Sequence, residues 1–303
     1  MDELLNIVKD ALEIGLIWSL LALGIFIAFR VLEFADLTAE GAVTMGGAVA
    51  ASLILKGAPP FIATLLSVAG GFLAGIVTGI LHTKLKIPAI LSGILTMTGL
   101  YSVNLRILGK SAVHMGDAAT IYTFPRGIIE NAFVAETLTT FLVVVIIFFV
   151  LYWFFGTEIG MSIRATGMNK KMARAQGINT DIMIIFGLAL ANALVALCGA
   201  LHAQSANSAN MDVGKGTIVI GLAAIILGEI LFGKRSFKNW LISVILGSVA
   251  YEVLVGVAIA LGLNPNDLKL LQAILIAFIL ALPLVKKIRA AKQRRKEGAY
   301  NRA

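Results

Sequence analysis

The sequence predicts an all-α fold, a polytopic transmembrane helix bundle of about eight to ten spans in two inverted-topology halves. Composition, the spacing of apolar segments and the placement of basic residues lead to this prediction. The chain is 59% hydrophobic and 14% charged, with a mean hydropathy of +0.93. Soluble domains carry about a quarter charged residues. A chain of 303 residues has room for roughly eight to ten spans of about 20 residues each.

Nine apolar segments are candidate spans. They lie at about 14–29, 41–55, 61–82, 88–108, 137–155, 181–203, 216–233, 238–262 and 270–285. The second is short and the ninth is only just long enough to cross a bilayer.

Basic residues in the short loops predict the orientation. Segments 82–87, 160–177 and 233–239 are rich in Lys and Arg, and residues 286–303 hold eight basic residues against Glu297 alone. Such clusters are retained in the cytoplasm. Loops 109–136, 204–215 and 263–269 are poor in basic residues, so we expect them outside, with the N-terminus outside and the C-terminus cytoplasmic. Because the net charge of +8 comes almost entirely from this membrane-anchoring tail, it does not indicate a nucleic-acid partner.

The two halves share a glycine pattern. Gly41-x4-Gly46-x-Ala48 matches Gly216-x4-Gly221-x-Ala223, and each copy follows a polar stretch. Five spans separate the copies, which inverts the second relative to the first and is typical of transporters that bind substrate near the repeat interface. We therefore expect one transmembrane domain over 1–303. It comprises a first half with a linking span (about 15–155), a cytoplasmic segment (156–180), a second half (181–285) and a basic tail (286–303).

Polar residues at membrane depth are candidates for a translocation pathway, because they are costly when they face lipid. Asp36, Thr38 and Glu40 precede the short second span. They predict either a broken helix that lines a pathway or a cytoplasmic loop in which Asp36 or Thr38 caps the helix. The complete candidate set for the pathway is Asp36, Thr38, Glu40, Gly41, Met45, Asn192, Gly221 and Glu229. Isolated polar residues inside other spans include Asn104, Arg106 and Glu252, for which hydrogen bonding between helices is the alternative.

Catalytic and nucleotide-binding motifs are absent from the sequence. The stretch 108–111 resembles the end of a phosphate-binding loop, but Asn104 occupies a position that requires glycine. The histidines lack metal-ligand spacing and Cys198 is the only cysteine, so we expect no metal site, no cofactor and no enzymatic activity in this chain. Active transport would then take its energy from a partner or an ion gradient.

Segment 160–177, GMSIRATGMNKKMARAQG, resembles the coupling segment of ABC-importer permeases of the branched-chain amino-acid and ribose superfamily. Stretches 35–51, 187–201 and 216–229 extend the resemblance, which covers roughly 15–285. The chain is most similar to the tryptophan and tyrosine uptake subgroup. The resemblance implies that the residues coupled to the ATPase are Arg164, Ala165, Gly167, Asn169, Ala173 and Gly177.

The resemblance also implies a bacterial inner-membrane location and several partners. These are an ABC ATPase that carries ATP and Mg, an extracytoplasmic substrate-binding protein, a second permease copy as a homodimer, and the surrounding lipid. Transport would be inward, by ATPase-driven alternating access, with an aromatic or branched-chain amino acid as substrate. Glu40 is an acid where sugar permeases have small or apolar residues, which argues against a sugar. The alternatives are an ion-gradient-driven secondary transporter and an ABC permease for a sugar or nucleoside.

Overall fold

The computed structural model describes residues 2–129 and 131–261, together with residues 270, 273, 274 and 277. Its elements in the first half are α1 (Asp2–Phe26), the π-helical turn η1 (Ile27–Val31), α2 (Thr38–Leu55), α3 (Pro60–Thr83), α4 (Ala89–Leu108), β1 (Ala112–His114), α5 (Thr123–Ile128) and α6 (Ala132–Phe154). The remaining elements are α7 (Glu158–Met168), α8 (Lys170–Ala175), α9 (Thr180–Ser205), β2 (Ser208–Asn210), α10 (Thr217–Phe232) and α11 (Phe237–Ala260).

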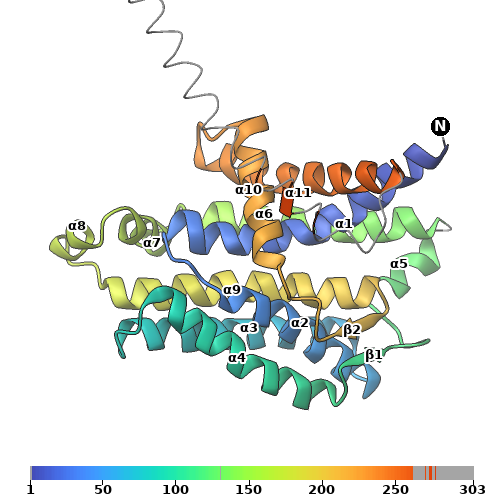
Figure 1. Cartoon of the computed structure of the whole chain (residues 1–303), viewed down its shortest axis with the longest axis horizontal. Coiled ribbons are helices and arrows are strands. Elements are labelled where there is room, and N and C mark those ends of the chain that lie inside the picture. Colours follow the sequence, from blue (N-terminus) through green and yellow to red (C-terminus); the bar gives the residue numbers. More distant parts are fainter. Residues whose placement is uncertain (1, 130, 262–269, 271–272, 275–276, 278–303) are drawn as a thin grey trace, which may run out of the picture.

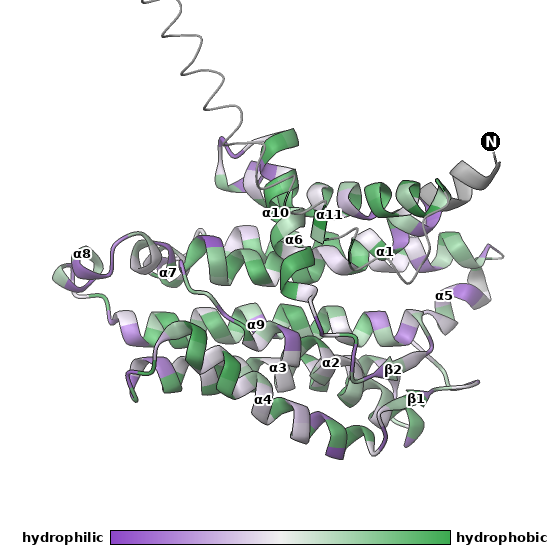
Figure 2. Ribbon diagram, viewed as in Figure 1, coloured by the Kyte–Doolittle hydropathy of each residue, from purple (hydrophilic) through white to green (hydrophobic). Residues whose placement is uncertain are grey.

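The predicted all-α polytopic fold is confirmed. Within the described ranges, seven helices are long and apolar enough to cross a membrane: the α1–η1 unit from residue 9 onward, α2, α3, α4, α6, α9 and α11. The apolar helix α10 is shorter, at 16 residues. The ninth candidate span lies largely outside the described residues, as does the basic tail. Figure 2 shows hydrophobic residues along the long helices and hydrophilic ones concentrated in the connections.

Helices α1 and α9 occupy the centre of the bundle. Both are largely buried, whereas α4, α6 and α11 leave most of their surfaces exposed. The main cluster of buried apolar side chains is drawn chiefly from α1 and α9. In Figure 1 these two helices lie side by side and run in opposite directions. The polar segments that adjoin them therefore pack against the main buried core.

Each half packs a helix along the central helix of the other half, which is the exchange expected of an inverted repeat. Helix α3 packs along α9, and α11 packs along α1. A Cβ atom added at Gly75 would lie 2.3 Å from the carbonyl oxygen of Leu188 in α9, and one added at Gly15 would lie 2.8 Å from the Cα of Val249 in α11. The two contacts are equivalent, because an offset of about 173 residues relates Gly15 to Leu188 and Gly75 to Val249.

The basic loops meet at one end of the bundle, which we call the basic end (residues 84–88, 156–179 and 233–237). Lys86 Nζ lies 4.0 Å from Asp181 Oδ2, and the Arg164 guanidinium lies 4.6 Å above the Phe237 ring. At the opposite end, which we call the strand end, β1 pairs antiparallel with β2. Common placement of the three loops is what the predicted orientation requires.

The close helix packing predicts that replacing glycine by leucine lowers stability strongly at one position and hardly at another. A Cβ added at Gly199 would lie 1.9 Å from the Val43 carbonyl oxygen, whereas one added at Gly99 meets nothing within 4 Å. Overpacking typically costs about 1–3 kcal/mol, so we expect Gly199→Leu to lower the melting temperature clearly and Gly99→Leu to leave it nearly unchanged. Cys198 is the only cysteine and is fully buried. A thiol-reactive dye that fluoresces as Cys198 becomes exposed measures both transitions, and equal melting temperatures would contradict the predicted packing.

Candidate translocation site and coupling segment

The connection between α1 and α2 passes through the interior of the protein. Helix α1 widens into the π-helical turn η1, after which Phe34 N donates to the Ala28 carbonyl at 2.9 Å. The buried Phe34 ring packs edge-on against His82, with the ring centres 5.0 Å apart. Residues 32–37 therefore form an ordered, non-helical segment in which Leu32, Phe34 and Asp36 are buried against other helices, while Glu33 is exposed.

Asp36 anchors this segment. Its side chain is 1% exposed and accepts two hydrogen bonds, from the Thr38 backbone N at 2.9 Å and from Asn192 Nδ2 at 2.6 Å. Burial of this loop carboxyl raises its pKa, and the bonds from Thr38 and Asn192 oppose the rise. The bond to the Thr38 N–H belongs to the capping alternative of the sequence analysis, yet its location is the buried interior and not an exposed loop.

A chain of threonine hydroxyls extends from the same point. Thr38 Oγ1 lies 2.6 Å from Thr78 Oγ1, and Thr78 in turn donates to Thr96 Oγ1 at 2.9 Å. We call Asp36, Thr38, Thr78, Thr96 and Asn192 the Asp36 network. It ties α2 to α3, α4 and α9 through buried polar groups, all of which need partners in the low-dielectric interior.

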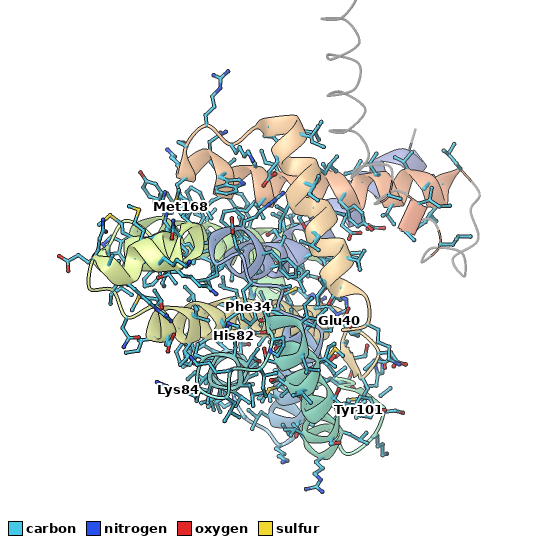
Figure 3. All side chains as sticks on the ribbon, turned by 60° about the vertical axis from the view of Figure 1, so that its left-hand side comes forward. Phe34, Glu40, His82, Lys84, Tyr101 and Met168 are labelled. Carbon is cyan, nitrogen blue, oxygen red and sulfur yellow. The ribbon has the colours of Figure 1, made fainter. Side chains whose placement is uncertain are left out.

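Glu40 lies one turn further along α2 and faces a different environment. It borders an open cavity of about 270 Å³ between α2, α4 and residues 211–215. We call this the Glu40 pocket; its lining residues are Glu40, Gly41, Thr44, Met97, Thr98, Tyr101, Asn104, Met211, Gly214 and Lys215. Glu40 Oε1 accepts a hydrogen bond from the Gly216 backbone N at 3.0 Å. Figure 3 shows Glu40 and Tyr101 on the same part of the bundle, remote from Met168.

The other predicted pathway residues lie elsewhere. Met45 borders an apolar groove between α3 and α4, and Gly221 packs against α1, where an added Cβ would lie 2.4 Å from Ile25 Cδ1. Glu229 accepts from Arg30 Nη2 and from Trp240 Nε1, both at 2.9 Å. The structure thus brings together Asp36, Thr38 and Asn192, and separately places Glu40 and Gly41 on one pocket.

Nothing in the sequence indicated that several residues lining the Glu40 pocket belong to a pathway. Tyr101 and Met97 sit within an apolar span, and Lys215 follows a polar loop that folds back against α2. The Lys215 ammonium lies 2.5 Å from Asp212 Oδ1, and this hydrogen bond raises the pKa of Lys215. Asn104 could be identified as a candidate from the sequence, because it is an isolated amide inside a span.

The predicted coupling segment forms two short helices, α7 and α8, at the basic end. Thr157, Asn169 and Asn179 each accept a backbone N–H bond as N-caps of α7, α8 and α9. Arg174 donates to Thr180 Oγ1 at 2.7 Å and to Asp181 Oδ1 at 2.9 Å, which holds the return into α9. The segment is therefore ordered, and each of α7, α8 and α9 begins at a residue whose side chain caps the helix.

The predicted coupling residues divide between an inner and an outer face. Gly167 packs so tightly that an added Cβ would lie 1.8 Å from the Val31 carbonyl oxygen, and Ala173 is 2% exposed. Ala165 is half-buried, and Gly177 adopts a positive φ of 83° after α8. The outer face instead presents Met168, Lys170, Lys171 and Met172, together with the edge of Arg164.

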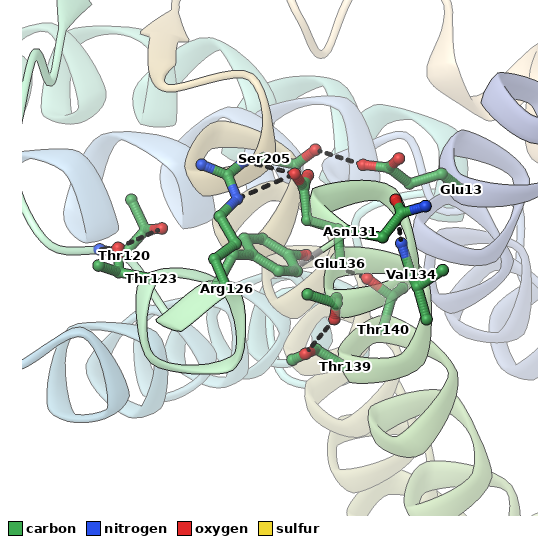
Figure 4. Close-up of polar contacts among 12 residues, drawn as sticks. Glu13, Thr120, Thr123, Arg126, Asn131, Val134, Glu136, Thr139, Thr140 and Ser205 are labelled. Atoms are coloured by element: carbon green, nitrogen blue, oxygen red, sulfur yellow. Dashed lines mark hydrogen bonds and ion pairs between the residues drawn. The ribbon is translucent and has the colours of Figure 1, made fainter. Parts of the chain in front are cut away.

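A second polar cluster closes the strand end, where Figure 4 shows the contacts. Arg126 of α5 donates to Glu136 of α6 through two nitrogens, with Nε at 3.0 Å from Oε1. Ser205 of α9 donates to Glu13 of α1 at 3.3 Å. These bonds join α5 to α6 and α9 to α1, and none of these residues borders the Glu40 pocket.

Within the part of the chain that the structure describes, no group of three or more His, Cys, Asp or Glu residues could hold a metal ion. The candidate site has three parts: the Glu40 pocket, the buried Asp36 network, and the surface segment formed by α7 and α8.

Family comparison decides between transporter classes. Residues 7–282 match the family described as the branched-chain amino acid transport system / permease component. This chain belongs to that family. It is accordingly a permease subunit of an ABC transporter, and the resemblance inferred from segment 160–177 is confirmed.

Individual relatives differ in the solutes that their names give. The chain is 39% identical to a tyrosine transport system permease protein of Clostridioides difficile (strain R20291), over 88% of each protein. It is 24% identical to a galactose/methyl galactoside import permease of Escherichia coli (strain K12), over 89% of this chain and 84% of that one. A ribose import permease of Haemophilus influenzae is also 24% identical, over 81% of this chain and 75% of that protein.

One solved structure shares the fold. It is an inward-facing ABC transporter described as metal-chelate type, with a TM-score of 0.51 and 17% identity over 93% of this chain and 85% of that one. At this identity the likeness concerns the helix arrangement alone.

Loss of the amide partner of Asp36 predicts a loss of stability. In Asn192→Leu the buried carboxylate loses its 2.6 Å bond, and an unsatisfied buried polar group costs about 1–3 kcal/mol, more when charged. We expect a lower melting temperature by Cys198 exposure, and a smaller loss when Asn192→Leu is combined with Asp36→Asn. Thr139→Val is the control, because Thr139 donates only to Ala135 of its own helix. Additive effects of the two changes would contradict the assigned contact.

Proposed function

We propose that this permease subunit moves an amino acid with an aromatic or branched apolar side chain into a bacterial cell across the cytoplasmic membrane. Support comes from the 39% identity to a tyrosine transport permease over 88% of both proteins, compared with 24% to the sugar permeases. The acid Glu40 on an otherwise largely apolar pocket suits a solute that carries an ammonium group.

The energy would come from a separate ATPase with bound ATP and Mg, and solute from an extracytoplasmic binding protein. Two copies of this chain would form the pathway between them, with the C-terminal tail in the cytoplasm. The ATPase would bear on the outer face of α7 and α8, while Asp36, Thr38 and Glu40 would lie along or behind the route. Membership in a family of ABC permeases favours this mechanism over transport driven by an ion gradient.

Uptake by the reconstituted transporter tests the proposal. Vesicles that contain this chain, its ATPase and its binding protein should accumulate L-tyrosine, L-tryptophan or L-leucine only when ATP is supplied. Accumulation of D-ribose or D-galactose in place of amino acids would overturn the substrate class. Accumulation by this chain alone under a sodium or proton gradient would overturn the ATP-driven mechanism.

The exposed methionines of α7 and α8 predict where ATPase contact is made. Met168 is 84% exposed and Met172 is 59% exposed, and flexible thioethers are suited to packing in a partner's groove. Burying a charge without a partner is costly, so we expect Met168→Asp to reduce coupled uptake about tenfold, which corresponds to about 1.4 kcal/mol. ATP-dependent uptake and the melting temperature are both measured.

Met168→Leu is the matched control for this prediction, because it retains an apolar side chain of similar size and should transport normally. Gly167→Val should lower the melting temperature, since Gly167 packs within the chain. Normal coupled uptake in Met168→Asp would place the ATPase contact elsewhere.

A further inference from the structure

We propose that the Glu40 pocket is a transit site for a zwitterionic α-amino acid, with its ammonium group against Glu40 and its carboxylate toward Lys215. The inference rests on the proposed function and deepens it, because it assigns chemical roles to residues of one pocket.

Asn104 holds the wall of the pocket beside Glu40 in place. Asn104 is 1% exposed, and its Nδ2 donates to the Gly41 carbonyl at 3.0 Å. Among the described residues, its Oδ1 has no hydrogen-bond partner. This oxygen is enclosed within the wall, so the bond to Gly41 fixes α4 against α2, and Glu40 is left as the group that meets a ligand donor.

Glu40 supplies the charge that selects the donor. One of its oxygens accepts the Gly216 N–H, and a carboxylate has capacity for further donors at both oxygens. A neutral hydroxyl could donate to this carboxylate, but an ammonium group donates to it and also pairs with its charge. Cationic donors form the stronger hydrogen bonds to a carboxylate.

Lys215 places a positive charge at another part of the rim. Its side chain is 63% exposed, and it directly precedes α10, whose N-terminal end carries partial positive charge. A ligand carboxylate near Lys215 would add to the Asp212 contact without breaking it, because an ammonium has three donors. The two rim charges of opposite sign match the two charged groups of an α-amino acid.

The remaining walls suit an apolar side chain better than a sugar. Met97, Tyr101 and Met211 present thioether and aromatic surfaces. The hydroxyls of Thr44 and Thr98 already donate to carbonyls of their own helices, at 3.2 and 2.8 Å. Few groups are left for the several hydroxyls of a sugar, whereas an aromatic or branched side chain needs only apolar contact.

Protection of an engineered thiol tests the site in the complete transporter. Thr98→Cys is made in a Cys198→Ala background, and the permease–ATPase complex is treated with a water-soluble methanethiosulfonate. L-Tyrosine, L-tryptophan and L-leucine are the probes. 4-Hydroxyphenylpropionate lacks the ammonium, tyramine lacks the carboxylate, and D-ribose is the sugar comparison. Lys56→Cys in the same background is the control for reagent reactivity, since Lys56 is exposed at the far end of α2 and lies outside the pocket lining.

We expect at least one amino acid to slow modification of Thr98→Cys about tenfold at ten times its dissociation constant, with no effect on Lys56→Cys. The analogues and D-ribose should protect far less. Adding Glu40→Gln, which retains an oxygen for Gly216 N–H, should abolish protection. Glu252→Gln on α11 should not, because Glu252 lies outside the pocket lining.

Equal protection by D-ribose or by 4-hydroxyphenylpropionate would overturn the proposed site, as would full protection in Glu40→Gln. ATP-dependent uptake measured on the same preparation separates the two proposals. Amino-acid uptake without protection by any amino acid would refute the transit site alone. Sugar uptake without amino-acid uptake would refute the proposed substrate class and the transit site with it.

Discussion

The rest of the structure depends on the close approach of α2 and α9. An added Cβ at Gly46 would lie 1.9 Å from the Ala196 carbonyl oxygen, and one at Gly199 would lie 1.9 Å from that of Val43. Each helix thus offers a glycine to the other's backbone. Inside a bilayer, helices gain little from the hydrophobic effect because lipid is equally apolar, so close packing and hydrogen bonds supply the association energy. The glycines of α3 extend the same contact along α9, where Gly71 and Gly75 face the carbonyls of Asn192 and Leu188.

Polar groups then fix the register that the glycines allow. Small residues permit close approach at several positions along a helix, but Asn192 reaches Asp36 at only one of them. The threonine contacts between α2, α3 and α4 impose the same requirement on two more helices, α3 and α4. Each of these buried groups would be costly without its partner. Bonds at the N-terminal end of the short second span, α2, therefore fix its position.

The sequence was sufficient for the class of fold but not for the geometry of the site. Apolar segments, loop charges and the Gly41 and Gly216 repeats depend on local composition, so the spans and their inverted halves could be predicted. The environment of Asp36 and Glu40 could not, although they are four residues apart. Helical periodicity places such residues on one side of a helix, but Asp36 precedes α2 and turns inward to Asn192, whereas Glu40 borders a cavity. That difference arises from residues 211–216, which are remote in sequence and fold back against α2.

In segment 160–177, Gly167 has a structural role inside the chain. Gly167 brings α7 against the Val31 carbonyl, and the next residue, Leu32, packs on Gly187 of α9. Residues 32–37 then lead to Asp36, and α2 begins beyond it with Glu40 in its first turn. The outer face of α7 and the Glu40 pocket are thus joined by continuous contacts through one short, irregular segment. Any force on α7 that displaces Val31 must either break the Asp36–Asn192 bond or carry the start of α2 with it. Because packed interiors shift between discrete arrangements and do not deform smoothly, the second outcome would change the shape of the pocket, with Glu40 on the moving element and Tyr101 on α4.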